Sequence, residues 1–578
     1  MALLNQAFFI ASLAGLVIGG KCNDLWTTLN ETVNGHLHSA TPLSLPCFSI
    51  YEGSPISPDP ASCADVQDNY TDSAWRAQFY NGFMNNQDEM CISNATDQCL
   101  LNNLLPTDPT AFTNKSCNQG SVSEFYLEIH SVADVVAALD FSKNTGTRLS
   151  IKNSGHDYLG RSSLKGSLAL WVHPLKNLTR TQEFIPEGCS QYTAVDSITT
   201  GAGVSTDEVY KFAEDEGVLI IGPYASSIGI SGGWVQAGGH SVLSPVYGLG
   251  IDRVLQYKII TTDGVLRVAN ECQNLDLFWA LRGGGGGTFG IVIESTHKVE
   301  PAISLTVSQI KFTPNSTTGV EWWSLLIRNS LAWANEGWGG HLTSNQLISV
   351  TPLLNLSSAI SSMSAVANFA TANGGSVTIE SLPSWYAFYV KYLLPNEAPV
   401  AGARILASRL IPVSLFSNDD GKQTLLDFLE YLISIGISPY VPATAPWLYP
   451  WVSNSTSATP AWRNSLWELG MAYTWAYNST VPEREAAVEF RRNLTVKVEE
   501  ITPGGGMYFN EADPFTVAWK ENWWGLENYE KLLEIKKKYD ADGLLNCWKC
   551  VGFEEEAAED KFPCYAAYDS SGGRFAGL

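Results

Sequence analysis

The feature that most constrains the fold is a strand, a helix and a second strand that follow one another directly. Residues 122–130 are rich in apolar and aromatic side chains, and residues 131–145 place apolar residues at helical spacing. Residues 148–151 alternate as a second strand and run into the Asn-Ser-Gly-His turn at 153–156. This order predicts an α/β layer. The small residues of the turn expose backbone N–H groups that can bind a diphosphate, although an ordinary strand-ending turn with a surface histidine fits equally well.

Further glycine-rich segments alternate with expected strands and helices. The expected strands cover residues 167–170, 192–195, 254–261, 265–268, 291–299 and 507–510, and the expected helices cover residues 206–216, 276–281, 319–335, 419–434 and 527–539. A Thr-Asp-Gly turn at 262–264 predicts a hairpin between two of these strands. The tail after residue 551 shows no clear pattern.

Composition narrows the class of protein. A chain of 578 residues is too long for one hydrophobic core and predicts two or more domains. Its 45% hydrophobic and 16% charged residues are typical of a folded globular protein. The net charge of −23 repels phosphate backbones and anionic lipid surfaces, so we expect neither nucleic acid nor a membrane as partner.

The N-terminus and the sequons predict secretion. Residues 1–20 form a short apolar run that ends in small residues, as in a signal peptide removed near Gly20, although no Lys or Arg precedes it. A membrane anchor is the alternative, but the run is short for one. Asn-x-Ser/Thr sequons, the acceptors of N-glycosylation, lie at Asn30, Asn69, Asn94, Asn114, Asn177, Asn315, Asn355, Asn454, Asn478 and Asn493.

Eleven cysteines, six of them before residue 120, predict a disulfide-tied N-terminal segment and at least one cysteine without a partner in the chain. The Cys547-Trp-Lys-Cys550 motif could be half of a zinc site or a redox pair. Because the sequence contains no second such motif, a structural disulfide is favoured and we predict no metal site.

Taken in order, the glycine-rich motifs resemble those of the FAD-linked oxidases of the vanillyl-alcohol oxidase superfamily, and in particular the secreted fungal members of its berberine-bridge-enzyme-like branch. The resemblance covers roughly residues 120–300 and 505–552, and neither a P-loop nor a Rossmann spacing explains these glycines. The motifs are Lys152-Asn-Ser-Gly-His-Asp-Tyr158, Gly201-Ala-Gly203, Ser231-Gly-Gly-Trp-Val-Gln-Ala-Gly-Gly-His240, Tyr247-Gly-Leu-Gly-Ile-Asp-Arg-Val254, Leu277-Phe-Trp-Ala-Leu-Arg-Gly-Gly-Gly-Gly286 and Tyr508-Phe-Asn510.

The resemblance implies a bilobed α+β fold. A PCMH-type FAD-binding lobe of two α/β subdomains would be joined to a substrate lobe with an antiparallel sheet backed by helices. The implied parts are a signal peptide (1–20), a Cys-rich N-terminal segment (21–118), the FAD-binding domain (119–300), the substrate-binding domain (301–500) and a C-terminal segment that completes the FAD-binding lobe (501–578).

The resemblance also implies a covalently bound FAD. The flavin-attaching histidine falls on His156, whose ring would bond the 8α-methyl group, and the surrounding loop would hold the diphosphate. The cysteine that attaches FAD a second time in many relatives has no counterpart in residues 225–233, so we predict one covalent bond only. The predicted cofactor-binding residues are His156, Lys152, Asn153, Ser154, Gly155, Asp157, Gly229, Gly232, Gly233, Gly239, His240, Ile291, Tyr508 and Asn510.

A flavin enzyme of this kind needs a base that takes a proton while the flavin takes a hydride. Tyr508 is the first candidate for that base, provided that a neighbouring cation lowers its pKa. Tyr386, Tyr389 and Arg409 are predicted substrate contacts, with Tyr392 and Arg404 as further candidates, although core packing explains the tyrosines at least as well.

Two further residues have open alternatives. His240 lines the flavin site or caps a loop. Ile228 falls where relatives place the residue that gates oxygen, or it packs in the core.

We therefore predict a secreted, monomeric FAD-linked oxidase that dehydrogenates an alcohol, carbohydrate, phenol or amine and reduces O₂ to H₂O₂. The alternatives are a dehydrogenase or an oxidative cyclase of secondary metabolism that uses O₂ poorly. An alternative of another class is a non-catalytic secreted glycoprotein on the same fold.

Overall fold

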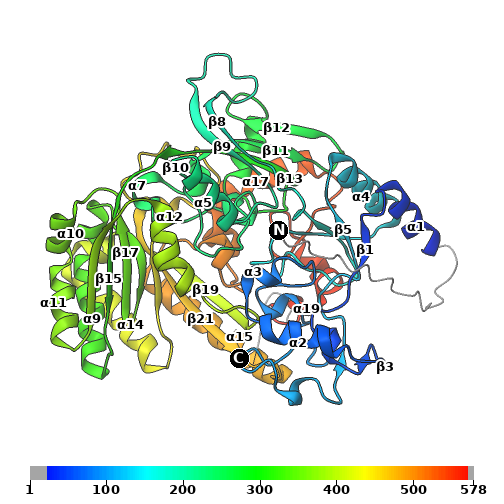
Figure 1. Cartoon of the computed structure of the whole chain (residues 1–578), viewed down its shortest axis with the longest axis horizontal. Helices are drawn as coiled ribbons and strands as arrows, with labels where there is room; N and C mark the ends of the chain where they lie inside the picture. Colours follow the sequence, from blue (N-terminus) through cyan, green and yellow to red (C-terminus); the bar gives the residue numbers. More distant parts are fainter. Residues whose placement is uncertain (1–21, 570–578) are drawn as a thin grey trace, which may run out of the picture.

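The computed structural model describes residues 22–569, so the predicted signal peptide lies outside the described residues. The chain forms two lobes (Figure 1). The second lobe contains a sheet whose strands run from Leu305 to Trp475, and the first lobe is built from the segments before and after it. Within residues 22–569, no helix has both the length and the apolar character that crossing a membrane requires.

The first sheet of the first lobe contains the predicted strand–helix–strand unit. Strands β5 (Phe125–Glu128), β7 (Leu168–Trp171) and β6 (Leu149–Lys152) are parallel, and β1 (Leu37–Ser39) pairs with β5 at the edge. Helix α4 (Val132–Thr145) connects β5 to β6. It begins at a capping box formed by Ser131 and Asp134 and ends at Gly146, whose φ of 74° suits a residue without a Cβ atom.

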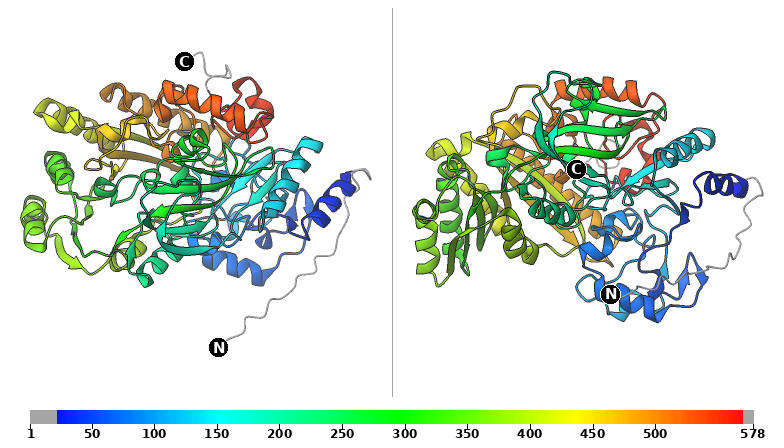
Figure 2. Two further views of the ribbon diagram at one scale, coloured as in Figure 1. Left: turned by 90° about the horizontal axis from the view of Figure 1, so that it is seen from above. Right: turned by 45° about the horizontal axis from the view of Figure 1, so that its top comes forward.

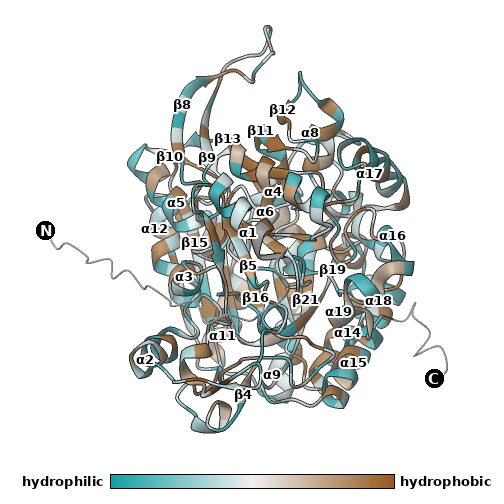
Figure 3. Ribbon diagram, turned by 90° about the vertical axis from the view of Figure 1, so that its right-hand side faces the viewer, coloured by the Kyte–Doolittle hydropathy of each residue, from teal (hydrophilic) through white to brown (hydrophobic). Residues whose placement is uncertain are grey.

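The second sheet of this lobe is antiparallel. Its order is β12 (Leu266–Asn270), β11 (Val254–Ile260), β13 (Ile291–Lys298), β9 (Val195–Gly201) and β8 (Leu178–Phe184). The predicted hairpin at 262–264 is confirmed, since β11 and β12 pair directly. The strand predicted at 192–195 is wrong, because β9 only begins at Val195. Strand β8 was not predicted, since it is mostly hydrophilic and exposed at the outer edge of the sheet (Figure 3).

Helices α5 (Thr206–Asp215), α8 (Leu275–Leu281) and α17 (Leu526–Tyr539) confirm three of the predicted helices of this lobe. Met507–Asn510 does not form the predicted strand. Phe509–Glu511 is a 3₁₀ turn, because no neighbouring strand pairs with this segment and its backbone bonds to Asn522 and within the turn instead.

The second lobe is a seven-stranded antiparallel sheet backed by helices. Its order is β18 (Ser376–Leu382), β15 (Leu305–Lys311), β17 (Gln346–Thr351), β16 (Gly339–Thr343), β20 (Tyr440–Ala443), β21 (Ser465–Trp475) and β19 (Ala403–Pro412). The helices at its outer side are α9 (Ser316–Asn335), α10 (Leu356–Ser362), α11 (Ser364–Ala372), α14 (Asp419–Ser434) and α15 (Val481–Ile501). Buried aromatic residues such as Trp322 and Trp467 fill the layer between sheet and helices. The other face of the sheet is turned toward the first lobe.

Helix α1 (Cys22–Thr32) of the N-terminal segment packs against α4, and the part with helices α2 (Pro60–Asn69) and α3 (Ser73–Arg76) lies beside the C-terminal segment (Figures 1 and 2). Among residues 22–569 the disulfides are Cys47–Cys63, Cys99–Cys117, Cys189–Cys272, Cys91–Cys564 and Cys547–Cys550. The prediction of a disulfide at Cys547 and Cys550 is confirmed. The tail after 551 contains the short helices η9 (Glu555–Ala557), α18 (Ala558–Lys561) and α19 (Pro563–Ala566), which Cys91–Cys564 ties to the N-terminal segment.

Candidate active site

A cavity of about 610 Å³ lies between the two lobes. From the first lobe it is lined by the loop after β6, by the glycine-rich segments near 229–233 and 286–290, and by residues of the 508–511 and 545–547 segments. From the second lobe it is lined by the inner face of the seven-stranded sheet. Met84 and Asn85 of the N-terminal segment complete the wall.

The glycines of this wall suit a ligand that is bound by the backbone. A Cβ atom added to Gly233 would meet no protein atom within 4 Å, although Gly233 lines the cavity. A Cβ atom on Gly229 would lie 2.0 Å from Oδ1 of Asn153, so this glycine lets the two loops pack closely. Backbone N–H groups exposed in this way bind phosphates, and an elongated dinucleotide such as FAD fits the donor set.

His156 lies on the cavity wall in the loop after β6 and is half-buried. Its Nε2 atom lies 2.7 Å from Oγ of Ser227. Burial, with a smaller contribution from the charge of Lys152, lowers the pKa of His156 to about 4, so the ring is neutral at pH 7. The Ser227 hydroxyl can accept from Nε2–H or donate to Nε2, and the first arrangement leaves the lone pair on Nδ1. No hydrogen bond to Nδ1 is formed within residues 22–569.

Lys152 does not present its side chain to this cavity. Its Nζ atom donates to the carbonyl oxygen of Phe79 at 2.9 Å and lies 4.7 Å from the ring centroid of Phe83. Burial lowers the pKa of Lys152 to about 7. Through its contacts with Phe79 and Phe83, the Lys152 side chain supports the loop from the side away from the cavity.

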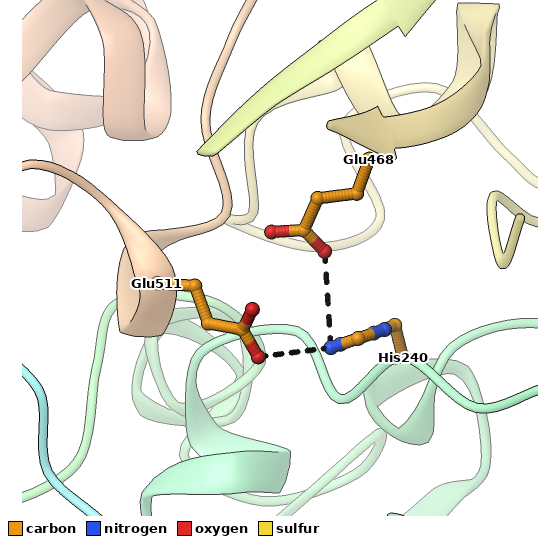
Figure 4. A group of neighbouring side chains, drawn as sticks. All are labelled: His240, Glu468 and Glu511. Carbon is orange, nitrogen blue, oxygen red and sulfur yellow. Dashed lines mark hydrogen bonds and ion pairs between the residues drawn. The ribbon is translucent and has the colours of Figure 1, made fainter. Parts of the chain in front are cut away.

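His240 is the centre of a cluster of titratable side chains from three separate chain segments (Figure 4). Its Nε2 atom lies 3.3 Å from a carboxylate oxygen of Glu511 and 3.8 Å from one of Glu468. Its Nδ1 atom lies 2.9 Å from the hydroxyl of Tyr224 and 3.1 Å from Oγ1 of Thr444, contacts that fix the orientation of the ring. His240 and Glu511 line the cavity, and Glu468 lies behind them.

Burial and the charges of neighbouring groups shift the pKa values of Glu468 and His240. Glu468 is completely buried, and neither of its carboxylate oxygens has a hydrogen-bond partner within the described chain. Burial and repulsion from Glu511 raise its pKa to about 8, against the opposing effect of His240. Burial alone would lower the pKa of His240, but the two carboxylates outweigh it and raise that pKa. Glu468 and His240 therefore both favour their protonated forms more than the isolated side chains do.

The three ligand atoms of this cluster lie within 4.8 Å of one another, a spacing that could also hold a metal ion. The sequence contained one signal for Glu468, which is a lone carboxylate in an apolar strand. That signal was missed.

Tyr508 and Asn510 line the cavity, but the environment of Tyr508 does not suit a base. Burial, then the carboxylates of Glu511 and Glu468, raise the pKa of Tyr508 above its usual value, whereas a base requires the opposite. Nδ2 of Asn510 donates to the Tyr508 hydroxyl at 2.9 Å and to the carbonyl of Gly233 at 2.9 Å. Tyr508 therefore remains a protonated phenol.

The predicted substrate contacts Tyr386, Tyr389 and Arg409 do not line the cavity. Arg409 is buried and donates to Thr502 and Asn522 at 2.7–2.8 Å. Successive side chains of a strand point to opposite faces, and Arg404, Leu406 and Ser408 of β19 occupy the cavity face.

The hydroxyl of Tyr389 donates to Asp207 at 3.3 Å, and the ring of Tyr386 packs beside that of Tyr389. By contrast, the further candidates Tyr392 and Arg404 do line the cavity.

The remaining predicted residues divide in the same way. Gly239 packs against Gly250 and Trp234, and neither it nor Ile291 reaches the cavity. The predicted residues that do line it are Asn153, Ser154, Gly155, His156, Asp157, Ile228, Gly229, Gly232, Gly233, His240, Tyr508 and Asn510. The sequence analysis missed Met84 and Asn85 as cavity residues, because the Cys-rich segment was assigned no part in the site.

Comparisons with known proteins identify the family of the chain. Residues 123–270 match the family model described as FAD binding domain, and residues 507–547 match the model described as berberine and berberine like. The FAD-linked oxidoreductase ffsJ of Aspergillus flavipes is 40% identical over 572 residues, which cover 93% of each chain.

Solved structures show the same fold. A VAO-type flavoprotein of Myceliophthora thermophila C1 superposes with a TM-score of 0.80 at 27% identity, over 93% of this chain and 97% of that one. The glucooligosaccharide oxidase of Acremonium strictum, whose FAD is 6-S-cysteinyl and 8α-N1-histidyl linked, superposes with a TM-score of 0.61 at 22% identity, over 74% of this chain and 92% of that one. The latter likeness shows the fold alone. The chain thus belongs to the berberine-like branch of the vanillyl-alcohol oxidase superfamily and is an FAD-linked oxidoreductase.

Proposed function

We propose that this protein is a secreted oxidase with FAD bound covalently through His156 only, and that it dehydrogenates an alcohol, carbohydrate, phenol or amine at the expense of O₂. The observation that carries the proposal is the position of the His240–Glu468–Glu511 cluster on the same cavity as His156. A proton-accepting group and the flavin-attachment residue then serve one substrate.

The residues around the glycine-rich wall fit the cofactor. The backbone of residues 153–157 and the glycines at 229, 232 and 233 would hold the diphosphate, and Nδ1 of His156 is the proposed point of attachment to the 8α carbon. When bound, FAD supplies the acceptor for a hydride from the substrate carbon and passes the two electrons to O₂, which leaves as H₂O₂. Asn510 joins Gly233 to Tyr508, so it would position the phenol beside the cofactor.

The cluster would take the proton that the substrate hydroxyl or amine releases. His240 Nε2 and the Glu511 carboxylate face the cavity, while Glu468 stabilises the transferred proton from behind. Tyr224 and Thr444 hold the imidazole through its other nitrogen. The charges of Glu511 and His240 both act on the pKa of Glu468, so the cluster as a whole is the proposed acceptor. Loss of the hydride and this proton converts an alcohol to a carbonyl compound, or an amine to an imine.

The test is a substrate panel with hydrogen peroxide as the readout, for the wild-type protein and for Glu468→Gln. We expect peroxide from the wild type and a strongly reduced turnover in the variant. Glu321→Gln is the matched control, because Glu321 is exposed on α9. Equal turnover by wild type and Glu468→Gln would overturn the proposed role of the cluster.

O₂ as the acceptor depends on Ile228, whose half-buried side chain lines the cavity. This position supports its role as an oxygen gate, but an isoleucine also favours the second candidate, a dehydrogenase that uses another acceptor. Turnover with O₂ compared with turnover with a dye acceptor separates the two, and Ile228→Val is expected to favour O₂.

Secretion and N-glycosylation are also part of the proposal. Eight of the ten sequon asparagines are exposed and therefore accessible to glycan transfer, whereas Asn30 and Asn69 are half-buried. Digestion with an endoglycosidase, read as a loss of mass, tests this. We further propose that the protein is monomeric and that the domain limits lie near residues 118, 300 and 500.

A further inference from the structure

Arg404 is a cation on the cavity wall without an acidic partner. Its Nη2 atom donates to the carbonyl of Pro399 at 3.1 Å, and its Nε atom is buried without a hydrogen-bond partner in the described chain. It forms no ion pair within residues 22–569. The other arginine of the wall, Arg161, differs, because its Nε lies 3.7 Å from Asp157 and its Nη2 bonds Asn510 at 3.3 Å.

The backbone of Arg404 is fixed by a residue of the N-terminal segment. The side-chain amide of Gln87 accepts from the Arg404 N–H at 3.1 Å and donates to its carbonyl at 2.7 Å. The same amide reaches the carbonyl of Tyr158, in the flavin-attachment loop, at 3.4 Å. Gln87 therefore holds the strand of Arg404 in register with that loop.

The cavity lining next to Arg404 in the chain includes the apolar Leu406 on the same strand and Leu393 and Val400 in the segment before it. Glu397 of that segment also lines the cavity, but its carboxylate accepts from Ser226 and Ser73. A guanidinium group with free N–H donors in such surroundings forms strong, charge-assisted hydrogen bonds with an anionic oxygen. Leaving those donors unpaired is unfavourable, so the wall is complementary to a ligand that supplies the acceptor.

We propose that Arg404 recognises an anionic oxygen of the substrate, which belongs to a carboxylate or an enolate. Gln87 positions Arg404 through its backbone. The substrate is then an apolar small molecule with one acidic group in addition to the group that is oxidised. A neutral oligosaccharide has no such group. This inference rests on the proposed function for the reaction, but the recognition itself is measurable without turnover.

The probe pair is 2-naphthoate and the neutral 2-naphthamide, titrated into the flavin-loaded protein and followed by perturbation of the visible flavin spectrum. Because a hydrogen bond to a charged group is stronger than one between neutral groups, we expect the wild type to bind the carboxylate about tenfold or more tightly than the amide. Arg404→Met is expected to abolish this preference, Arg404→Lys to retain part of it, and Gln87→Ala to weaken it.

Arg328→Met, an exposed change on α9, is the control for the loss of a positive charge. Flavin content and the melting temperature establish that each variant is folded, and Arg404→Lys keeps the test decisive if the Met variant is unstable. Equal binding of the two probes by the wild type, or a preference that persists in Arg404→Met, would overturn the inference. Probe binding without peroxide from any substrate would instead count against the proposed oxidase while the recognition site stands.

Discussion

A carboxylate oxygen of Glu468 on β21 lies 3.8 Å from Nε2 of His240, across the boundary between the two lobes. Glu468 is fully buried and His240 is on the wall of the cavity. The pair therefore exists only when the second lobe is docked on the first, which couples the proton-accepting group to the assembled active site.

Replacing Glu468 by Gln keeps the shape of the side chain but removes its exchangeable carboxyl proton. We expect kcat to fall about 10²- to 10⁴-fold, the range typical of lost general acid–base catalysis, with the flavin spectrum retained. Steady-state kinetics with the best substrate of the panel measures this. A fall in kcat in the exposed control Glu321→Gln would show that the effect is not specific to the cluster.

The buried carboxyl of Glu468 also predicts a pH dependence of stability. Its pKa is raised from 4.5 to about 8 in the folded protein, so the fold favours the protonated form. Its contribution to stability is complete below about pH 4.5 and is lost as the pH rises toward 8. The melting temperature of Glu468→Gln minus that of the wild type should therefore rise between about pH 4.5 and 8 and stay constant above about pH 8. A difference that is constant with pH would contradict the assigned shift.

Ser227 is expected to assist covalent attachment of the flavin. Its hydroxyl lies 2.7 Å from Nε2 of His156, and by accepting a hydrogen bond from Nε2–H it would favour the tautomer with a free Nδ1. Ser227→Ala should slow the attachment and lower the fraction of flavin that stays with denatured protein, while Ser227→Thr keeps the hydroxyl. Full and equally rapid attachment in Ser227→Ala would show that the tautomer is set in another way.

The disulfide Cys91–Cys564 joins segments that are 473 residues apart, whereas Cys547–Cys550 spans 3. A crosslink that closes a longer loop restricts the unfolded chain more. The double Cys→Ser variant at 91 and 564 should lose about 2–5 kcal/mol in the free energy of unfolding, and more than the variant at 547 and 550. Chemical denaturation measures both, and the reverse order would contradict the loop-length argument.

Removal of metal ions should change nothing. The His240–Glu468–Glu511 cluster has a spacing that fits a cation, but the raised pKa of Glu468 means that the group holds a proton at neutral pH. Activity and the visible spectrum are expected to be the same before and after treatment with a chelator. A loss of activity that zinc or another divalent ion restores would assign the cluster to a metal.

The sequence allowed the first lobe to be predicted where local signals decide the structure. The helical spacing of apolar residues in 131–145 and the Thr-Asp-Gly turn at 262–264 are such signals, and both elements form as expected. Prediction from the sequence failed where partners from elsewhere in the chain decide the structure. The 507–510 segment has the composition of a strand but pairs with no strand within residues 22–569.

The site shows the same division. His156 and the glycine-rich segments could be placed from their motifs, and they line the cavity. Glu468 was not singled out and Arg409 was placed ahead of Arg404, because the face of a strand that meets the other lobe depends on the packing of the lobes. Tyr508 was assigned the role of the base, which its surroundings do not support, because burial and then the carboxylates of Glu511 and Glu468 raise its pKa.

The most direct test of the central claim, an FAD-linked enzyme with its cofactor attached at His156, is the visible spectrum of the purified protein before and after acid precipitation. The account predicts that the yellow colour stays in the wild-type pellet and that no colour stays in the pellet of His156→Ala. Release of the flavin from the wild-type pellet into the supernatant would contradict the covalent bond at His156.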